Sequence, residues 1–482
     1  MWGIVAVYFI TLIVVGILTS RLVKNSGQYY LGGKQFGPVF TAFRFASTFE
    51  SGAMMVGTPG MAYASGMPAF LQGFLSPLGY FFAFRVFGQR LKVACDHFNT
   101  ITVPQLLEKR YDSRTVRVLG SIAILIGLIG SVTAQLKAMG EVFAMLLNIP
   151  YMYAVLIGVL VVGIYSICGG YLATAWANFI QGVIMLVGAI VLFSYTSMAA
   201  FGKVGGFDFP ARLNAEIAKV NPDMLTITGG GQVPVLLIIV FIFIALTVGL
   251  AMPQQVVTLF SMRDVRVARI SLVICSFFSV ILLWSLLPSA MMAHIILPAV
   301  DNPDRVIPAL VSSVLPVWLG GIFIAAILSA IMSTVGSIIL VAASALSQDI
   351  FSIVAPQVYE KHPVLYDRIA VALMVIIPLL VALKPPAIIF WIILFSFGMI
   401  VVTFLMPMFG TIFWKRATKH GAIAGMLVGM ILVPLWAILG DPVIPGLLLG
   451  LIAGPLAFII GSLVTQPPKE IVEPLWEAYS QI

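Results

Sequence analysis

Charged side chains are scarce in this chain of 482 residues: aspartate, glutamate, lysine and arginine make up 9% of it, whereas 61% of the residues are hydrophobic. Soluble domains carry about 25% charged residues and roughly 45–50% apolar residues. The low charge content therefore excludes an ordinary water-soluble domain. Together with a mean hydropathy of +1.10, it predicts that lipid surrounds most of the chain.

Cysteine and histidine are also sparse, with three and four residues. Cys95, Cys168 and Cys275 are scattered and lack the spacing of metal ligands, and the histidines form no cluster. No group of histidine, cysteine or acidic residues suits catalysis. We therefore expect no enzyme and no cofactor.

Long apolar runs dominate the chain. A membrane-spanning helix needs roughly 20 mostly apolar residues, and thirteen candidates lie near 2–20, 37–64, 68–91, 118–147, 150–168, 173–200, 232–260, 267–298, 318–347, 368–383, 387–414, 421–440 and 443–465. Only helices and closed barrels satisfy the backbone in lipid, and these runs are too long for barrel strands. The sequence predicts an all-α polytopic membrane protein with thirteen transmembrane helices.

Lysine and arginine residues indicate the side of the membrane on which each loop lies, because they accumulate in cytoplasmic loops. With the N-terminus outside and the C-terminus in the cytoplasm, most of the 26 basic residues fall in cytoplasmic loops. The predicted external loops hold only Lys203, Arg212, Lys219, Arg305 and Lys384. The net charge of +8 is thus spread over loops that flank the membrane. This distribution predicts a multi-pass protein of the plasma (inner) membrane and argues against a nucleic-acid partner.

The span near 37–64 carries polar residues, glycine and proline where a plain membrane helix would be apolar. Ser47, Thr48 and Glu50 are followed by Gly57 and Pro59. Glycine weakens a helix and proline removes a hydrogen bond, and transporter sites lie where membrane helices unwind near the bilayer midplane. Carbonyls freed here would coordinate a cation. The alternative is a kinked helix whose polar residues face neighbouring helices.

A second interruption is predicted in the span near 232–260, where Gly249 precedes Pro253 by four residues and two glutamines follow. It lies five helices after the first interruption, which is the spacing of an inverted five-helix repeat. A simple proline kink is the alternative.

In the span near 318–347, Ser329, Ser333 and Ser337 are four residues apart and share one helix face. Hard cations prefer oxygen ligands. Hydroxyls on this face and carbonyls of a broken helix would therefore form a neutral, weakly binding cage for sodium. Small residues also serve plain helix packing, so that interpretation stays open.

Six short motifs spread along the chain indicate one and the same relationship. They are Tyr-Leu-Gly-Gly at 30–33, Thr-Val-Pro-Gln-Leu-Leu-Glu-Lys-Arg-Tyr at 102–111, Gly-Gly-Tyr at 169–171, Ala-Ile-Met-Ser-Thr at 330–334, Lys-Pro-Pro at 384–386 and Trp-Lys-Arg-Ala at 414–417. With them the chain resembles the sodium:solute symporter family over nearly its whole length, and within that family the sodium/pantothenate symporters.

The resemblance implies inward symport driven by the sodium gradient, and a thirteen-helix fold of the leucine-transporter type with two inverted five-helix repeats. It implies an extra helix and a cytoplasmic loop at 1–36, the first repeat at 37–200, an external loop at 201–231, the second repeat at 232–414, and two C-terminal helices with a tail at 415–482. The implied sodium ligands are carbonyls of Ser47, Glu50 and Ala330 and hydroxyls of Ser333 and Thr334. The solute would lie beside them, near Thr48, Phe49, Ala53, Met54, Gln135, Gly249 and Pro253.

Two departures from the family pattern bear on the coupling ion. Many members have an aspartate where this chain has Asn178, and because asparagine carries no charge we expect one sodium ion per cycle. Arg44 and Glu50 stand in the broken helix where relatives usually have neutral residues. Glu50 would strengthen cation binding or take up a proton, so a proton-coupled symporter of the same fold is an alternative. A transporter-like membrane sensor is an alternative of another class.

Arg44 and Lys137 place positive charge inside predicted spans, which costs at least about 2.5–3.5 kcal/mol on insertion scales and usually marks function. Arg44 would bind a solute carboxylate through a two-pronged hydrogen bond, or extend to the cytoplasmic surface, or pair with Glu50. Lys137 lies four residues before Glu141, within pairing distance. Two basic residues near the core suit an anionic solute such as pantothenate or another monocarboxylate. The expected partners are this solute, sodium and the lipid bilayer, with a monomer as the oligomeric state.

Overall fold

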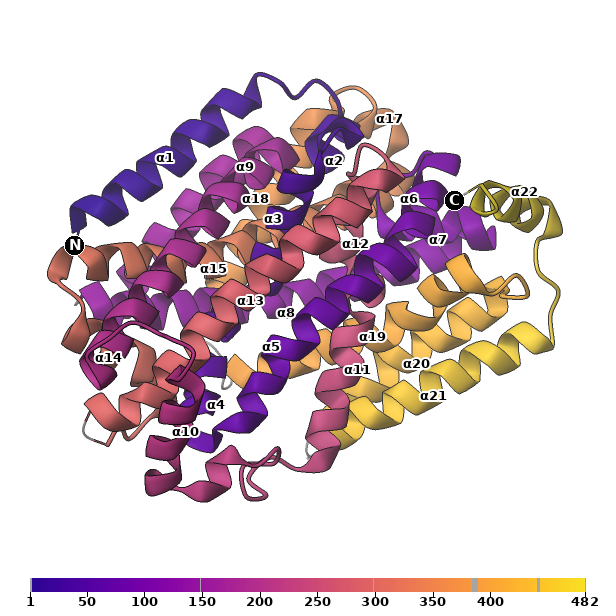
Figure 1. Ribbon diagram of the computed structural model, residues 1–482. Helices are drawn as coiled ribbons and strands as arrows, with labels where there is room; N and C mark the ends of the chain where they lie inside the picture. Colours follow the sequence, from indigo (N-terminus) through magenta and orange to yellow (C-terminus); the bar gives the residue numbers. More distant parts are fainter. Residues whose placement is uncertain (1, 148, 298, 384–388, 440–442, 482) are drawn as a thin grey trace.

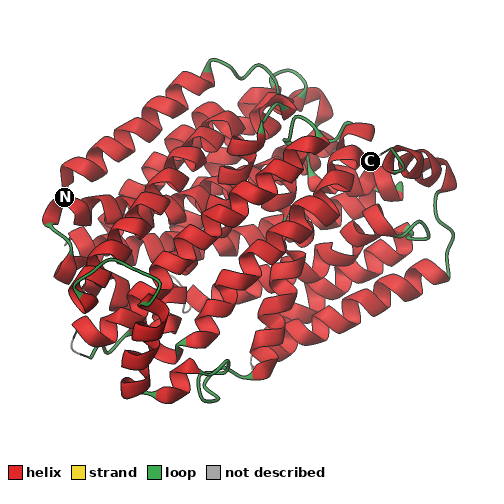
Figure 2. Ribbon diagram, viewed as in Figure 1, coloured by secondary structure: helices red, strands yellow, loops and turns green. Residues whose placement is uncertain are grey.

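The computed structural model describes residues 2–147, 149–297, 299–383, 389–439 and 443–481. Every regular element in these ranges is a helix, and the one strand-like pairing there joins Phe36 to Met262. The long helices form one bundle (Figure 1), and the loops lie where these helices end (Figure 2). The prediction of an all-α fold is confirmed. The motif at 384–386 lies outside the described residues.

The first 201 residues contain the elements from α1 to α9. They are α1 (Trp2–Ser20), α2 (Ser26–Leu31), η1 (Gly32–Lys34), α3 (Pro38–Phe49), η2 (Ala53–Gly57), α4 (Thr58–Ser65), α5 (Met67–Tyr80), η3 (Phe81–Gly88), α6 (Gln89–His97), α7 (Val103–Tyr111), α8 (Arg114–Leu147) and α9 (Tyr151–Phe201).

The rest of the chain contains the elements from α10 to α22. They are α10 (Phe209–Val220), η4 (Pro222–Leu225), α11 (Val235–Ala251), α12 (Pro253–Phe260), α13 (Val265–Ile296), η5 (Pro303–Arg305), α14 (Val306–Val314), α15 (Val317–Ser344), η6 (Ala345–Phe351), α16 (Ser352–Val354), α17 (Pro356–Tyr359), α18 (Pro363–Ala382), α19 (Ile389–Phe413), α20 (Lys419–Ile438), α21 (Val443–Leu463) and α22 (Lys469–Tyr479). The predicted external loop at 201–231 thus contains a helix of its own, α10.

The number of membrane crossings is the part of the prediction that stays open. Within the described ranges, 10 helices are long and apolar enough to cross a membrane, or 11 if the bent pair α11–α12 is one span. The predicted span at 37–64 is absent from this set because it is divided into α3, η2 and α4, each too short to cross alone. The predicted spans at 150–168 and 173–200 count once because both lie in α9. The total of thirteen therefore remains a prediction.

Helix α9 is divided near its middle. Its 51 residues would make a rod of about 76 Å at 1.5 Å per residue, more than twice the roughly 30 Å of a bilayer core. Gly170 interrupts the helical conformation with φ 53° and ψ −134°. A β-carbon there would lie 2.5 Å from Tyr29 O, so only glycine fits this turn. The arms 151–169 and 171–201 match the two predicted spans.

Helix α15 occupies the centre of the bundle. Every residue of its most apolar window is buried, and it packs against α9, α8, α18, α1 and α3. A helix that is apolar on all sides is stable only when other helices surround it. The serine face predicted for this helix therefore lies inside the protein rather than towards lipid.

The two ends of the chain lie at opposite ends of the bundle. Helix α1 packs against α9 and α15 and begins at the left of Figure 1, whereas α22 lies at the right beside α6 and α7.

Candidate functional site

The first interruption lies where the sequence predicts it. Helix α3 ends at Phe49, and Glu50 leaves the helical conformation with φ −76° and ψ 64°. The N–H of Ser51 then bonds to Phe49 O at 2.8 Å, and the chain resumes at Ala53 as the π-helix η2. Short π-helical stretches inside membrane helices often accompany functional sites. The segment 50–51 is therefore unwound, and 44–60 is not one continuous helix.

Helix α15 meets this unwound segment through its hydroxyls. Ser333 Oγ lies 2.7 Å from Ser47 O and 3.0 Å from Ala330 O. Thr334 Oγ1 lies 3.0 Å from Thr48 O and 3.1 Å from Ala330 O. All five residues are buried. Four of the predicted sodium-site residues, Ser47, Ala330, Ser333 and Thr334, thus meet at one junction, here called the α3–α15 junction.

The chemistry of the junction suits a hard monovalent cation. Its oxygens are backbone carbonyls and alcohol hydroxyls, the neutral ligands that alkali ions accept in place of water. The hydroxyls of Ser333 and Thr334 come from the continuous helix α15. The carbonyls that face them come from the last turn of α3, where the helix is broken. A cation held here would therefore hold α3 and α15 together.

The second interruption separates α11 from α12. Met252 adopts φ −94° and ψ 109°, and the two helices are bent by 46°. Pro253 is the first residue of α12, where a missing N–H has no cost. The broken pair that the sequence predicts five spans after the first break is present.

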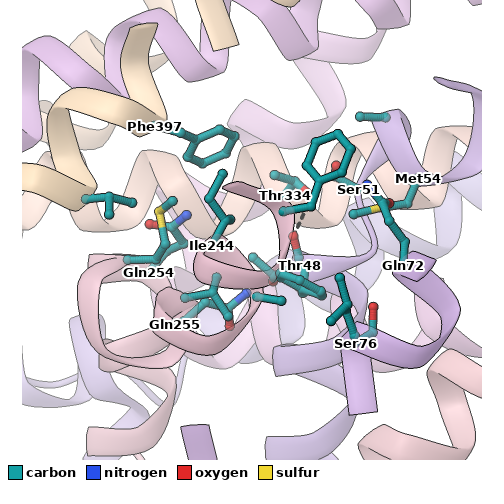
Figure 3. A pocket seen from close by; sticks show the side chains of 18 of the residues that line it. Thr48, Ser51, Met54, Gln72, Ser76, Ile244, Gln254, Gln255, Thr334 and Phe397 are labelled. Carbon is teal, nitrogen blue, oxygen red and sulfur yellow. Dashed lines mark hydrogen bonds between the residues drawn. The ribbon is translucent and has the colours of Figure 1, made fainter. Parts of the chain in front are cut away.

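A cavity of about 290 Å³ lies between these two breaks. Its lining from α3, η2 and the segment between them includes Thr48, Phe49, Ser51, Ala53 and Met54. The rest comes from α5, α11, α12, α15, α19 and α21: Gln72, Leu75, Ser76, Phe241, Ile244, Ala245, Val248, Met252, Gln254, Gln255, Thr334, Phe397, Gly398, Val401, Leu447 and Leu451. Figure 3 shows the glutamines of α12 and α5 on opposite walls, with Thr48 and Thr334 between them.

The predicted solute-site residues divide into two groups. Thr48, Phe49, Ala53 and Met54 line the cavity; Arg44, Gln135, Lys137, Gly249 and Pro253 are absent from its lining.

Gly249 and Gln135 pack close to the cavity without lining it. A β-carbon at Gly249 would lie 2.2 Å from Ala83 Cβ, so this glycine permits close contact between α11 and η3. A β-carbon at Gly52 would lie 3.5 Å from Gln135 Oε1, which places the Gln135 amide beside the unwound segment.

Known proteins resemble this chain in sequence and in fold. A sequence profile of the sodium:solute symporter family matches residues 29–429. The chain belongs to the sodium:solute symporter family. It is therefore a multi-pass membrane transporter from a family of sodium-coupled symporters, and not an enzyme.

Individual relatives agree with this assignment. The symporter is 27% identical to the sodium/pantothenate symporter of Escherichia coli over 90% of this chain and 91% of that one. It is 26% identical to the osmoregulated proline transporter of Bacillus subtilis over 90% of this chain and 88% of that one. Its fold matches a substrate-bound, outward-open Na+-coupled sialic acid symporter with a TM-score of 0.82 at 18% identity, over 97% and 98% of the two chains. This likeness confirms the predicted leucine-transporter-type fold, whereas the repeat boundaries stay predictions.

In the symporter, Arg44 is buried without an acidic partner in the described part of the chain. Its Nη1 donates to Thr174 Oγ1 at 2.8 Å, and its Cζ lies 3.9 Å above the ring of Tyr171. Cation–π contact of this kind offsets part of the desolvation of the guanidinium. Arg44 thus faces α9 and neither reaches the surface nor pairs with Glu50, two of the alternatives that the sequence left open.

Lys137 lies 3.9 Å from Glu141 Oε1, with a side chain that is 17% exposed. The pairing predicted from the four-residue spacing is present. The structure leaves its predicted role in the solute site untested.

The Glu50 carboxyl bonds to residues of α5 and α13 and not to the hydroxyls of the α3–α15 junction. Its Oε1 accepts hydrogen bonds from Ser279 Oγ at 2.6 Å and Tyr80 Oη at 2.9 Å, so the side chain faces α13 and α5. A Glu50 carbonyl remains the predicted sodium ligand, whereas its carboxyl belongs to a separate buried cluster.

Asn178 and Ser337 form a second polar cluster that the solute-site prediction omits. Asn178 Nδ2 donates to Ser337 Oγ at 3.0 Å and to Thr48 Oγ1 at 3.2 Å, and these two hydroxyls are 2.9 Å apart. The four-residue spacing of the serines on α15 is the signal for Ser337. For Gln72, Gln254 and Gln255 the sequence offers only their polarity inside apolar spans.

Proposed function

We propose that the protein imports a small, carboxylate-bearing organic solute together with one sodium ion across the plasma membrane. The observation that carries this proposal is that Thr48 and Thr334 belong both to the α3–α15 junction and to the wall of the cavity. A sodium ion at the junction would order the wall against which the solute binds. Because the two sites share this wall, each ligand would bind more tightly to the state that the other ligand stabilises. Coupling between two sites requires such a difference in affinity.

The size and lining of the cavity favour a small solute of mixed polarity. Its volume of about 290 Å³ is at the lower end of ligand pockets, which range from roughly 300 to 1,000 Å³. No lysine or arginine occurs among the lining residues that the structure describes, so a carboxylate would be matched by the amides of Gln72, Gln254 and Gln255 and by the sodium charge nearby. Apolar walls from α11, α19 and α21 would hold the hydrocarbon part. The names of the relatives support this class, since pantothenate and proline both carry a carboxylate.

The proposed order of events begins at the α3–α15 junction. Sodium enters from outside and joins α3 to α15, which orders the unwound segment. The solute then binds beside it. The bundle changes from an outward-facing to an inward-facing state, and sodium leaves into the cytoplasm. For a monovalent anion with one sodium ion the net charge moved is zero, so the membrane potential adds no driving force.

We place the N-terminus outside and the C-terminus in the cytoplasm, with a monomer as the transport unit. A C-terminal reporter that is active only in the cytoplasm tests the orientation.

Uptake into proteoliposomes tests the proposal. We expect labelled pantothenate or proline to accumulate when an inward sodium gradient is imposed and not when potassium replaces sodium. Accumulation should be unaffected by valinomycin-imposed potentials for pantothenate. Uptake of either solute at a rate that does not depend on the sodium gradient would contradict the proposed sodium coupling.

A proton-coupled mode is the second candidate, and the buried carboxyl of Glu50 favours it. This side chain is 0% exposed and has no basic partner within the described ranges, and an uncompensated buried carboxylate is costly. A proton on Glu50 would remove that cost. Uptake that follows an imposed pH gradient in sodium-free vesicles, and that Glu50→Gln abolishes, would support this candidate; no such uptake in sodium-free vesicles would exclude it.

A further inference from the structure

Helix α13 lies along α3 and binds it through one of its faces. Ser271, Cys275 and Ser279 are four residues apart, so they share that face. Ser271 Oγ donates to Pro38 O at 3.0 Å, and Cys275 Sγ donates to Ala42 O at 3.3 Å. Ser279 meets α3 at its C-terminal end. These three side chains, here called the α13 row, follow α3 up to the point where it unwinds.

Other serines of α13 use their hydroxyls differently. The hydroxyls of Ser276, Ser285 and Ser289 each donate to the carbonyl four residues earlier in α13 itself. A serine inside a helix commonly bonds in this way. Ser279 instead donates to Glu50 Oε1 at 2.6 Å. The Ser279 hydroxyl is therefore directed by the carboxyl of another segment and not by its own helix.

Tyr80 of α5 binds the same carboxyl oxygen from a second helix. Its Oη donates to Glu50 Oε1 at 2.9 Å. The centre of its ring lies 5.8 Å from that of Phe45 and 5.7 Å from that of Phe49, both in edge-to-face contact. Glu50, Tyr80 and Ser279 are all buried, and Glu50 Oε2 finds no partner in the described ranges. The carboxyl is thus held through one oxygen by α5 and α13 together.

These two hydrogen bonds act on the residue at which α3 unwinds. Glu50 has φ −76° and ψ 64°. Backbone groups without a partner are costly in an apolar span, so an unwound stretch persists there only when surrounding contacts hold it. The carbonyls of Ser47 and Thr48, one turn earlier, face the hydroxyls of α15. The side chain of Glu50 therefore holds the backbone that carries the oxygens of the α3–α15 junction.

We propose that Ser279 and Tyr80 are positioning residues for the sodium site. They hold the Glu50 carboxyl, and through it they keep the segment 50–51 unwound and the carbonyls at the end of α3 pointed at the ion. This inference rests on the proposed function, which places sodium at the α3–α15 junction. Neither residue is among those that line the cavity. Without them a smaller fraction of molecules would have the unwound segment, and the apparent affinity for sodium would fall by the same factor.

Sodium titrations of the purified full chain test this proposal. Thermal unfolding in detergent is followed while sodium replaces choline, and uptake of labelled proline or pantothenate is measured in proteoliposomes. Ser279→Ala and Tyr80→Phe each remove one donor to the carboxyl. Ser271→Ala is the matched control, because it removes a contact of the α13 row at the other end of α3. Ser276→Ala is a second control, which removes a hydrogen bond within α13.

We expect Ser279→Ala and Tyr80→Phe to raise the sodium concentration for half-maximal stabilisation about three- to tenfold, as loss of one hydrogen bond between membrane helices predicts. At saturating sodium, the solute concentration for half-maximal uptake should equal that of the wild type, because the bound ion restores the unwound segment. In both controls the sodium dependence should be unchanged, whatever their unfolding temperature in choline. In a Glu50→Ala background Ser279→Ala should cause no further shift, because the group through which it acts is absent.

The wild type shows which of the two proposals fails. If sodium stabilises the wild type and its half-maximal concentration is the same in Ser279→Ala and Tyr80→Phe, the positioning role alone is overturned. An equal shift in Ser271→Ala, or a further shift from Ser279→Ala in the Glu50→Ala background, also overturns it. If sodium neither stabilises the wild type nor drives its uptake, the inference and the proposed sodium coupling fail together.

Discussion

At the scale of single residues, the site depends on where a few oxygen atoms point. Ser333 and Thr334 direct their hydroxyls at the carbonyls of Ser47 and Thr48, whereas the carboxyl of Glu50, on the same broken helix, faces α5 and α13. One segment thus divides its polar groups between a neutral junction and a separate acidic cluster. The carboxyl of Glu50 is therefore bonded apart from the hydroxyls of Ser333 and Thr334.

Replacing Ser333 by alanine removes one oxygen from the α3–α15 junction. Loss of a ligand of this kind costs on the order of 1–3 kcal/mol. We expect Ser333→Ala to raise the sodium concentration for half-maximal uptake about tenfold or more, with the solute concentration dependence less affected.

The control for this prediction is Ser194→Ala, because among the described residues the Ser194 hydroxyl bonds only to the carbonyl of Ile190 in its own helix. An unchanged sodium dependence in Ser333→Ala would mean that the junction does not bind the ion.

At the scale of elements, three interruptions shape the bundle. The breaks after Phe49 and at Met252 bring polar groups to the cavity, and the break at Gly170 divides α9 into two arms. Each break has a local cause: an unwound turn followed by a π-helix, a proline at the start of the next helix, and a glycine with positive φ. The long uninterrupted helices, α8, α13 and α15, hold these breaks in place.

Replacing Gly170 by alanine should destabilise the protein. The glycine has φ 53°, and an added β-carbon would lie 2.5 Å from Tyr29 O. Backbone strain and steric overlap together cost on the order of 2–4 kcal/mol. We expect Gly170→Ala to lower the thermal unfolding temperature in detergent and the yield of folded protein.

Gly163→Ala in the same helix is the matched control. There an added β-carbon would make an ordinary contact, 3.4 Å from Val375 Cγ1. If the two variants were equally stable, the break at Gly170 would carry no strain.

At the scale of the whole molecule, the α3–α15 junction joins the first broken helix to the buried centre of the bundle. An ion at this junction should therefore stabilise the entire fold rather than one loop.

Removing sodium tests the link between the junction and global stability. A ligand present at 100 times its dissociation constant stabilises the folded state by about 2.7 kcal/mol. We expect the unfolding temperature to fall when choline replaces sodium at constant ionic strength, and the difference to shrink in Ser333→Ala. Equal unfolding temperatures in the two salts would argue against sodium binding in the solute-free protein.

Much of the site could be predicted because broken membrane helices have a local signature. Glycine, proline and hydroxyl residues inside apolar runs predicted both breaks, whereas the meeting of Ser47 with Ser333 and Thr334 was implied by the family resemblance. The direction of Arg44 could not be predicted: in sequence it stands near the solute residues, but it packs on Tyr171 and bonds to Thr174. The face that a side chain occupies depends on which helices surround it, and adjacent residues on a helix point about 100° apart.

The sequence by itself determined that the chain is a membrane-embedded helical bundle, where its helices are interrupted, and to which family it is similar, because composition and local backbone chemistry decide these properties. Only the tertiary structure decided which residues enclose the cavity and that the Glu50 carboxyl faces away from the junction. These relations join residues from helices far apart in the chain, and no local pattern records the packing that brings them together.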